Sequence, residues 1–350
     1  MGGNFSRDEL AQAARNHGMP LEGMRYDLTP AGMHYLLIHY DIPDADASSH
    51  TLEFVGAVAQ PLRLSVEELR ARPAATTTVT MECAGNGRTL YETWPTSQPW
   101  QREAVGTAEW TGVPVAALLD EAGIADDALE VVFTGLDRGI EGGEEQDYER
   151  ALTIDEIRRG EAIVAYAMNG QPLLPQHGAP LRLLVPGWYG MTNVKWLARM
   201  TAVREPFDGY QHRVAYRLSA EEDDPGIPLS RIEPRSLMIP PGMPGFPGRE
   251  RTADAGEHVL RGRAWSGIAP IQRVEVSSDG GSTWVDAELD PPMGEFAWRG
   301  WSHTWDATPG RHVLASRATD SAGNSQPMTA EWNRGGFANN GVQLVEVTVR

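Results

Sequence analysis

A proline- and glycine-rich run near residue 240 divides the chain into two parts that must fold differently. Four prolines and three glycines lie between Ile239 and Gly248, after an acidic stretch at 221–224. Proline lacks a backbone donor and glycine weakens regular structure, so this run cannot sustain a helix or a central strand. We therefore predict a connector over residues 219–250, laid along a surface between one domain at 1–218 and another at 251–350.

The part before the connector mixes short helix signals with strand signals. Ser65 to Glu68 and Thr153 to Glu156 each match a capping box, in which a hydroxyl accepts from the backbone and a glutamate reaches back. Pro114 and Gly123 bracket a third helical segment. Strand patterns occur at residues 36–40, 76–80, 129–134 and 181–185. Irregular alternation of short helices and strands favours an α+β domain over a doubly wound sheet.

The part after the connector has the pattern of an all-β domain. Val274 and Val276 alternate with polar residues, and a tight turn at 279–281 leads into a return strand at Trp284. Further strand patterns follow at residues 298–305, 312–319 and 342–349, with another turn at 320–324. Short strands at this spacing over about a hundred residues predict a small β-sandwich.

The charge balance limits the partners of the chain. Lys and Arg number 30 against 48 Asp and Glu, which gives a formal net charge of -18. A field of this sign repels nucleic acid and anionic membranes, so neither partner is expected. No apolar run approaches the roughly 20 residues of a membrane span, and residues 1–20 lack the apolar core of a signal peptide. We expect a cytoplasmic protein, and a mature periplasmic form without its leader would look the same.

Cys83 is the only cysteine, so the chain cannot form an internal disulfide. It follows the strand predicted at 76–80 and precedes a Gly-Asn-Gly turn, with Arg88 beyond. A nearby cation favours the thiolate, which attacks electrophiles and binds soft metals. The alternative is a small buried hydrophobe. The glycines and Arg88 favour chemistry.

The segment at 83–88 resembles the molybdenum-binding loop of the sulfite oxidase family. Segments at 133–137, 165–173, 177–182 and 185–197 resemble further segments of the family and follow in the same order. Residues 274–284 and 330–333 resemble its immunoglobulin-like dimerisation domain. The resemblance covers nearly the whole chain. It implies an α+β molybdopterin-binding domain followed by an immunoglobulin-like β-sandwich, through which the protein would form a homodimer.

The resemblance also implies a molybdenum–molybdopterin cofactor and the residues that hold it. Cys83 would be the sulfur ligand that the protein supplies to the metal. The residues at cofactor-contacting positions are His39, Asp137, His177, Arg182, Asn193, Val194 and Lys195. Arg182 and Lys195 can meet a phosphate, since guanidinium and ammonium groups are its usual partners. Asp137 can accept hydrogen bonds from ring nitrogens.

For the substrate, the resemblance implies a second set of residues. Arg88 would bind an anion beside the metal, Tyr148 would be the active-site tyrosine, and Trp100 would line the pocket. Arg334 is the arginine expected from the C-terminal domain, one residue early relative to the family. Sulfite-oxidising members carry a further arginine where this chain has Leu37. A pocket with one cation fewer binds a small dianion more weakly, so the substrate is sulfite bound poorly or something less charged.

The implied activity is the oxidation of sulfite to sulfate by oxygen-atom transfer at an oxo-molybdenum centre. The substrate would then be a small oxyanion or a sulfur oxide. One alternative is oxygen abstraction from a sulfoxide, which the neutral Leu37 suits. Another is a non-catalytic relative that acts as an interaction module, against which the retained site residues argue. A cysteine hydrolase would need a histidine base beside the thiolate, and His39 and His177 fit the cofactor set better.

The sequence has no haem-attachment motif and no cysteine set for an iron–sulfur cluster. We therefore expect no haem in this chain. Electrons are expected to leave to a separate carrier or to a small acceptor.

Overall fold

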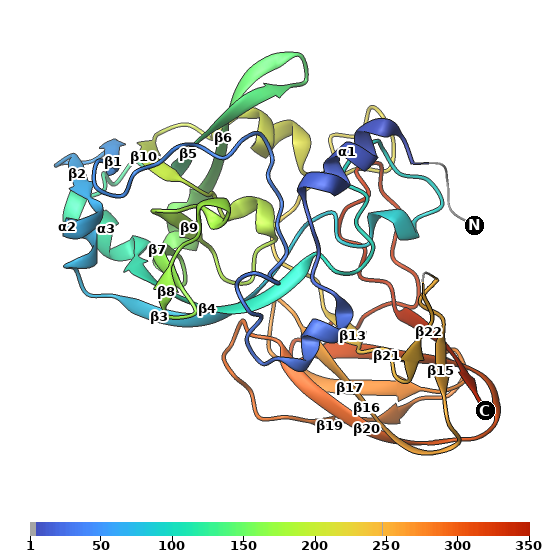
Figure 1. The fold of residues 1–350 in the computed structure, drawn as a ribbon. Coiled ribbons are helices and arrows are strands. Elements are labelled where there is room, and N and C mark those ends of the chain that lie inside the picture. The colour runs from blue at the N-terminus through green and yellow to red at the C-terminus, as the bar shows by residue number, and fades with distance from the viewer. Residues whose placement is uncertain (1–4, 247) are drawn as a thin grey trace.

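The computed structural model describes residues 5–246 and 248–350. Residues 1–4 of the N-terminal segment and Pro247 of the predicted connector lie outside the described part. Figure 1 shows two lobes, one with two sheets and short helices and the other a β-sandwich at the C-terminal end. The expected order of an α+β domain followed by an all-β domain is confirmed. No helix in the described ranges is long and apolar enough to cross a membrane.

The first lobe is built on two sheets that share one core. The first sheet has the order β2 (Leu62–Ser65), β1 (Thr51–Gly56), β10 (Leu197–Val203), β5 (Glu130–Glu141) and β6 (Glu144–Thr153). The second contains β3 (Ala75–Glu82), β4 (Val105–Pro114), β7 (Ile163–Met168) and β8 (Gln171–Pro172), with β9 (Arg182–Leu184) paired to β7. Phe54, Phe133 and Leu183 are buried in the core cluster between them.

The helices of this lobe are short, and all of them except α1, for which no helix was predicted, begin or end at residues that the sequence indicates. They are α1 (Arg7–Arg15), α2 (Val66–Arg70), α3 (Val115–Ala122) and α4 (Ile154–Arg158). Ser65 accepts a hydrogen bond from the Glu68 backbone at 3.1 Å, and the Glu68 carboxylate accepts one from the Ser65 backbone at 2.8 Å. Thr153 caps α4 by accepting from Glu156, and α3 ends at Gly123 with a positive φ of 65°.

Single helical turns make the remaining short elements. They are η1 (Leu21–Arg25), η2 (Arg88–Leu90), η3 (Pro175–His177), η4 (Gly190–Thr192) and the π-type turn η5 (Gln211–Ala215). Two of them, η2 and η3, contain predicted site residues.

The strand predicted at residues 36–40 is wrong, because this stretch is an irregular loop with a single bridge between Leu36 and His17. Side chains satisfy backbone groups that a neighbouring strand would otherwise pair with. The Asn16 side-chain oxygen accepts from the Ile38 backbone at 2.7 Å, and Lys195 donates to the Leu37 carbonyl at 2.8 Å. Periodicity alone could not reveal these partners, which come from distant parts of the chain.

The second lobe packs two sheets face to face. One has the order β13 (Arg235–Met238), β16 (Gly256–Trp265), β20 (Arg299–Ala307) and β19 (Glu288–Leu289). The other has the order β14 (Met243–Pro244), β15 (Arg251–Ala253), β22 (Gln343–Val349), β21 (Gly310–Asp320), β17 (Ile271–Ser277) and β18 (Val285–Asp286). Along β22, residues alternate between buried and exposed, as a strand with one face on a core requires.

The predicted connector is more ordered than its composition indicates. Residues 217–218 (β11) and 227–228 (β12) form a small hairpin, and β13 lies inside the expected range of 219–250. Arg235 to Met238 contain no proline, so they can pair with β16 as an edge strand and are fully buried. The proline- and glycine-rich run follows only after this strand.

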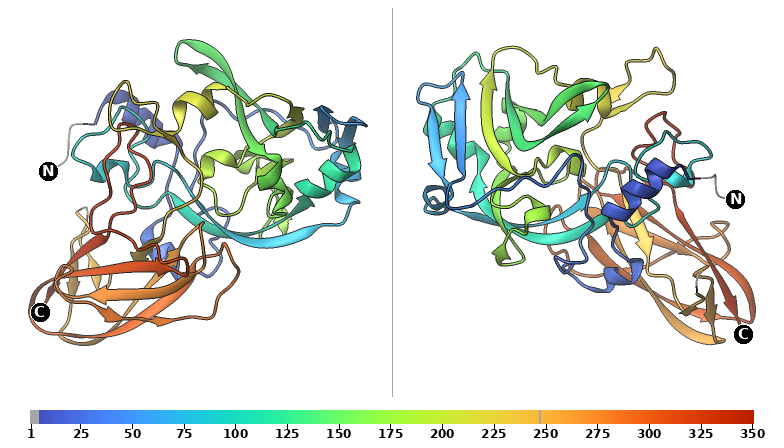
Figure 2. Two further views of the ribbon diagram at one scale, coloured as in Figure 1. Left: turned by 180° about the vertical axis from the view of Figure 1, so that it is seen from behind. Right: turned by 45° about the horizontal axis from the view of Figure 1, so that its top comes forward.

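A segment of the second lobe returns to the first. Figure 2 shows that the chain before β22 leaves the sandwich and runs along the other lobe. Here Ala338 donates to the Ala84 carbonyl at 2.8 Å, and the Asn339 side chain donates to the Gly87 carbonyl at 3.1 Å. The turn that follows Cys83 is therefore packed between the two lobes.

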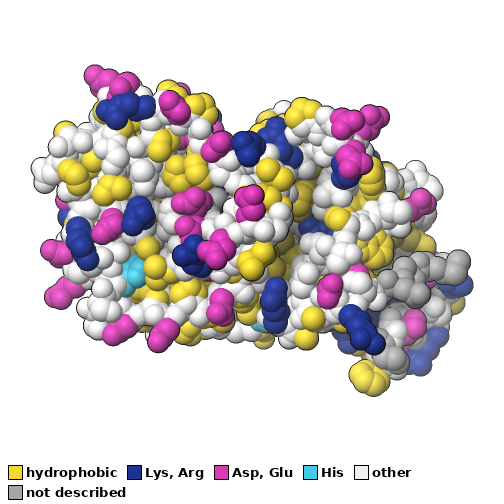
Figure 3. Space-filling model, turned by 90° about the horizontal axis from the view of Figure 1, so that it is seen from above, with side chains coloured by type: hydrophobic (Ala, Val, Ile, Leu, Met, Phe, Trp, Pro, Cys, Tyr) yellow, Lys and Arg dark blue, Asp and Glu magenta, His cyan; other side chains and the backbone are white. Residues whose placement is uncertain are grey.

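Charged side chains are spread over the surface. Figure 3 shows acidic and basic groups interspersed across the face seen from above. Arg138, for example, pairs with both Glu145 and Asp147 at 3.2 Å on the β5–β6 hairpin. Paired surface charges of this kind contribute little to stability, about 0–1 kcal/mol each.

Candidate functional site

Two cavities of the first lobe meet at Cys83. The inner cavity encloses about 660 Å³ of space, including its open mouth, and is lined chiefly by residues 34–39, 176–195 and the end of β3. The outer cavity encloses about 910 Å³ and is lined by α1, residues 96–100, Arg88 and Phe337. Four residues line both cavities: Leu37, His39, Cys83 and Tyr216. A group held in the inner cavity would therefore meet a molecule in the outer one beside Cys83.

Cys83 follows the last residue of β3 and is buried, with 8% of its surface exposed. Its backbone donates to Ala104 at 2.9 Å and accepts from Asn86 at 2.9 Å, which fixes the start of the turn. Burial raises the pKa of the thiol, although the Gly85 backbone and the Arg88 guanidinium act in the opposite direction. The sequence indicated that the nearby cation favours the thiolate, and in the structure desolvation of the thiol opposes this effect of Arg88. A bound metal is what would hold this sulfur as a thiolate.

The described ranges contain no cluster of three or more His, Cys, Asp or Glu side chains able to hold a metal ion. A metal beside Cys83 would thus need ligands from outside the protein. A cofactor that brings its own sulfur ligands meets this requirement.

The inner cavity is lined by several buried polar atoms that have no hydrogen-bond partner in the described part of the chain. Among the described residues, Arg182 Nε, Asp137 Oδ1 and His34 Nε2 line this cavity and are buried without a hydrogen bond. Buried polar atoms are normally paired, so these atoms indicate a ligand with both donors and acceptors. A heterocycle that carries a phosphate has that combination.

The cations of the inner cavity are held by neutral groups. Arg182 donates to the carbonyl oxygens of His177 at 3.0 Å and Asn193 at 3.2 Å. Lys195 donates to Leu37 at 2.8 Å and to Gln176 at 3.3 Å. Burial lowers the pKa of Lys195, and the neighbouring charge of Arg182 lowers it further. An anionic group in the cavity would offset this cost, which fits a phosphate.

Asp137 and His177 complete the inner wall. Burial raises the pKa of Asp137, against the opposing effect of Lys195. His177 lies in η3, and its Nε2 is 3.1 Å from the Ala31 carbonyl. Burial and the charge of Arg182 lower the pKa of His177 to about 4, so its imidazole is neutral at pH 7. The wall thus offers a neutral ring and a carboxylate to a heterocycle.

Two predicted cofactor residues have other roles in the structure. His39 lines the inner cavity, but its Nε2 already lies 2.8 Å from the Glu141 carboxylate. Val194 is fully buried in the hydrophobic core and does not line the inner cavity. The neighbouring Asn193 does, and its side-chain oxygen accepts from the Val185 backbone at 2.7 Å.

Arg88 presents a buried positive charge to the outer cavity. Its guanidinium donates to the carbonyl oxygens of Gln98 at 2.9 Å and Gly335 at 3.2 Å and lies over the Phe337 ring. Neutral acceptors leave its charge available to an anion. Trp100 lines the same cavity as predicted, and its Nε1 finds no acceptor among the described residues. An arginine and an indole donor can therefore bind oxygen atoms next to Cys83.

The structure brings a different tyrosine to the junction of the cavities. Tyr148 lines the inner cavity, where its hydroxyl donates to the Met191 carbonyl at 2.8 Å, and it does not line the outer one. Tyr216 lines both, with its ring near Phe337 and beneath the Arg150 guanidinium. Burial raises the pKa of Tyr216, so it is a protonated donor at pH 7. The sequence did not predict Tyr216 as a site residue, because no local pattern around it points to the cavities.

Arg334 does not reach either cavity. Its side chain is exposed, and its backbone donates to Ser219 at 2.9 Å. Phe337 from the same segment lines the outer cavity instead. Leu37 lies at the junction, so the departure from the family's arginine falls on the wall beside Cys83.

A buried thiol lies between a cavity whose cations suit a phosphate and a cavity lined by an arginine, which is the arrangement expected of a pterin-dependent metalloenzyme domain. Two family models match the chain: the oxidoreductase molybdopterin-binding domain over residues 39–211, and the Mo-co oxidoreductase dimerisation domain over residues 249–350. The chain belongs to the sulfite oxidase family of molybdopterin oxidoreductases. Its cofactor is molybdenum bound to molybdopterin, and the inner cavity fits that group.

Named relatives agree on the family but differ in activity. The chain is 32% identical to the mitochondrial sulfite oxidases of Rattus norvegicus and Homo sapiens, over 92% of this chain and 62% of theirs. It is also 32% identical to nitrate reductase [NADH] 1 of Oryza sativa subsp. japonica, over 92% of this chain and 38% of that one. The chain thus spans less than two thirds of the length of these relatives.

A solved structure supports the fold over nearly the whole chain. The sulfane dehydrogenase SoxCD from Paracoccus pantotrophus superposes with a TM-score of 0.83 at 25% identity. The match covers 95% of this chain and 86% of that one. Both lobes and their arrangement are therefore shared with this sulfane dehydrogenase.

Proposed function

We propose that the chain oxidises sulfite to sulfate. The observation that carries this proposal is the buried guanidinium of Arg88, which faces the outer cavity beside Cys83 and donates only to carbonyl oxygens in its known hydrogen bonds. A buried cation with neutral partners favours an anionic substrate. In the overall reaction sulfite gains one oxygen atom from water, and two electrons and two protons are released.

When bound, the molybdenum cofactor supplies the oxygen-atom transfer and the two-electron chemistry. Cys83 would ligate the metal through its thiolate. Arg182 and Lys195 would neutralise the pterin phosphate, while Asp137 and His177 would pair with polar atoms of the heterocycle. These residues bind and orient the cofactor, and burial of the inner cavity excludes water from it.

In the outer cavity Arg88 would orient the oxyanion and stabilise the charge that develops on it. Tyr216 would donate a hydrogen bond to the substrate from its protonated hydroxyl. Trp100 would supply a further donor through its indole nitrogen. The three groups come from separate segments of the chain and all line the outer cavity.

A second candidate function is oxygen abstraction from a sulfoxide. Leu37, Trp100 and Phe337 give the outer cavity apolar surface that suits an organic substituent. Leu37 also removes the charge that a dianion would use. Identity does not separate the activities, because sulfite oxidases and nitrate reductases match the chain equally well.

The partners are also part of the proposal. The protein would form a homodimer through its C-terminal domain, which the match to a dimerisation-domain model supports. It would pass electrons to a separate carrier or a small acceptor. Sedimentation at micromolar concentration tests the dimer, and a monomer under those conditions would remove that part of the proposal. Trp298, Trp301 and Trp305 are buried in this chain, so they do not supply the contact surface.

The test begins with molybdenum and pterin content of protein purified from a host that makes the cofactor. Sulfite with ferricyanide and methionine sulfoxide with a reduced viologen dye are then supplied separately. Sulfite turnover that is lost in Cys83→Ser supports the proposal. Turnover of the sulfoxide alone would favour the second function. Absence of molybdenum would favour a non-catalytic interaction module.

A further inference from the structure

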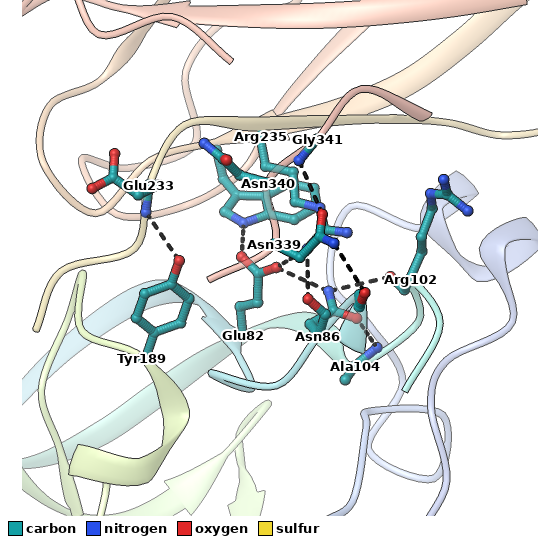
Figure 4. A network of polar contacts seen from close by, with 12 residues as sticks. Glu82, Asn86, Arg102, Ala104, Tyr189, Glu233, Arg235, Asn339, Asn340 and Gly341 are labelled. Atoms are coloured by element: carbon teal, nitrogen blue, oxygen red, sulfur yellow. Dashed lines mark hydrogen bonds and ion pairs between the residues drawn. The ribbon is translucent and has the colours of Figure 1, made fainter. Parts of the chain in front are cut away.

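A buried carboxylate lies directly before the metal-ligating cysteine. Glu82 ends β3, and its side chain is only 3% exposed. Its Oε1 accepts from Arg235 Nη1 at 2.5 Å and from Asn86 Nδ2 at 2.9 Å, while its Oε2 accepts from Trp265 Nε1 at 2.7 Å. Figure 4 shows the Glu82 carboxylate with Asn86 and Arg235 beside it. Three donors satisfy a charge that would otherwise be costly to bury.

Two of the donors come from the other lobe. Arg235 lies in β13 and Trp265 ends β16, and the two residues face each other in the pairing of these strands. One cross-strand pair of the sandwich thus presents both donors to one carboxylate of the first lobe. Arg235 is 1% exposed, so the ion pair crosses the joint between the lobes without contact with solvent.

The same carboxylate is linked to both ends of the turn at Cys83. Asn86, which donates to Glu82, also accepts from the Ala104 backbone at 3.1 Å. Ala104 in turn accepts from the Cys83 backbone at 2.9 Å. Arg235 further donates to the Asn86 carbonyl at 3.4 Å. The contacts form a closed ring around the turn, so a shift of Arg235 or Trp265 would be transmitted to Cys83.

The side chains of Glu82 and Cys83 point in opposite directions. Successive residues of an extended strand point to opposite sides. Glu82 points to the sandwich, where Trp265 and Arg235 hold it, and Cys83 lines the cavities on the other side. Fixing the side chain of Glu82 therefore also fixes the backbone from which the Cys83 side chain projects toward the cavities.

We infer that Glu82, Arg235 and Trp265 are positioning residues for the metal-ligating sulfur. They touch neither the substrate nor the cofactor cavity, and they act through the backbone at Cys83. The second lobe would thus set the geometry of the metal site in addition to any role in dimerisation. This inference rests on the proposed role of Cys83 as the molybdenum ligand.

If these three residues were purely structural, substituting them would lower the free energy of unfolding. The electronic state of a bound metal would stay the same. If they position the ligand, substituting them would alter the direction from which the Cys83 sulfur meets the metal. This direction affects the electron paramagnetic resonance spectrum of Mo(V). Mo(V) can be produced by chemical reduction without any substrate.

The test uses two variants of the full-length, molybdenum-loaded protein. Glu82→Gln combined with Arg235→Met removes both charges, since removing one alone would leave the other buried and unpaired. Trp265→Phe removes one donor and keeps both charges. The control is Glu275→Gln with Arg317→Met, which removes another ion pair of the sandwich, with contacts of 2.7 and 3.1 Å. That pair makes no contact with the turn at Cys83.

The double variant should show an altered Mo(V) spectrum and a kcat about 10-fold lower, with KM unchanged, as expected for residues that orient a metal ligand. Trp265→Phe should shift the spectrum in the same direction by less, and the control should match the wild type. If the double variant does not fold, Trp265→Phe decides. A folded, loaded variant with the spectrum and kcat of the wild type would overturn the inference. Absence of a Mo(V) signal in the wild type would instead contradict the proposed function.

Discussion

Lys195 donates a hydrogen bond from Nζ to the carbonyl oxygen of Leu37 at 2.8 Å. A cation of the inner cavity therefore holds the backbone of Leu37, the position at which the resemblance implies an arginine in sulfite-oxidising members of the family. The side chain of Leu37 lies at the junction with the outer cavity. A charged side chain at position 37 would thus change the charge of the outer cavity, while Lys195 still holds the backbone.

Leu37→Arg should strengthen the binding of sulfite. The new guanidinium would lie beside Arg88 and provide charge-assisted hydrogen bonds to a dianion, worth about 1.5–3 kcal/mol each. We expect KM for sulfite to fall by about tenfold or more, measured in steady-state assays at constant ionic strength.

Thr96→Arg is the matched control, because Thr96 lines the same cavity but is exposed. Its charge is screened by solvent, so KM should change much less. An equal effect of both substitutions would show that overall charge, and not position 37, governs binding.

Tyr216→Phe and Tyr148→Phe should differ in their effects on catalysis. Tyr216 lines the outer cavity, so loss of its hydroxyl should reduce kcat/KM by about tenfold, the equivalent of one hydrogen bond. Tyr148→Phe removes the bond to Met191 and should lower stability by about 1 kcal/mol, with a smaller effect on turnover. A larger loss of kcat/KM in Tyr148→Phe would support Tyr148, the tyrosine that the sequence predicted, as the active-site residue.

His34 should make the cofactor-free protein less stable as the pH falls. Burial, with the neighbouring charges of His177 and Arg182, lowers its pKa from 6.5 to about 3. The unfolded chain therefore binds a proton at this site below about pH 6.5, while the folded chain does not until about pH 3. Between pH 7 and 5 this group should lower the free energy of unfolding by about 2 kcal/mol.

Urea unfolding of wild type and His34→Asn at pH 7 and pH 5 measures the contribution. The asparagine amide can replace the contact between His34 Nδ1 and the Tyr35 carbonyl, which is 3.1 Å long. The loss on acidification should be smaller in the variant by the contribution of the histidine. Identical losses would mean that His34 is protonated in the folded state at pH 5.

Gly112→Ala should destabilise the second sheet of the first lobe. A Cβ at this position of β4 would lie 2.2 Å from the Val164 carbonyl oxygen of β7, and backbone cannot move away cheaply. We expect a loss of about 2 kcal/mol by chemical denaturation. Gly32→Ala is the control, since no neighbouring atom lies within 4 Å of the place where its methyl group would go, and the change should stay within about 0.5 kcal/mol.

The parts of the fold that local chemistry determines could be predicted from the sequence. The hydroxyl caps of α2 and α4 and the strand β22 are each set by neighbouring residues, and all three were predicted. The loop at 36–40 was not, because its backbone is satisfied by Asn16 and Lys195 from far away in the chain.

The site shows the same division. Resemblance brought Cys83, Asp137, Arg182 and Lys195 together, and all four line the inner cavity. It could not separate Tyr216 from Tyr148, because both are buried tyrosines and only the course of the chain through η5 brings Tyr216 to the outer cavity. The contact between Glu82 and Arg235 joins residues 153 positions apart, and no local pattern announces it.

Residues 34–37 and His39 line the inner cavity, and residues 37–39 of the same stretch line the outer one. Retention of the cofactor and choice of substrate therefore both depend on this one loop. A mutation that retunes one trait in this loop perturbs the other, so a lineage that changes substrate here must do so through replacements that leave the backbone in place. Leu37 is a replacement of that kind.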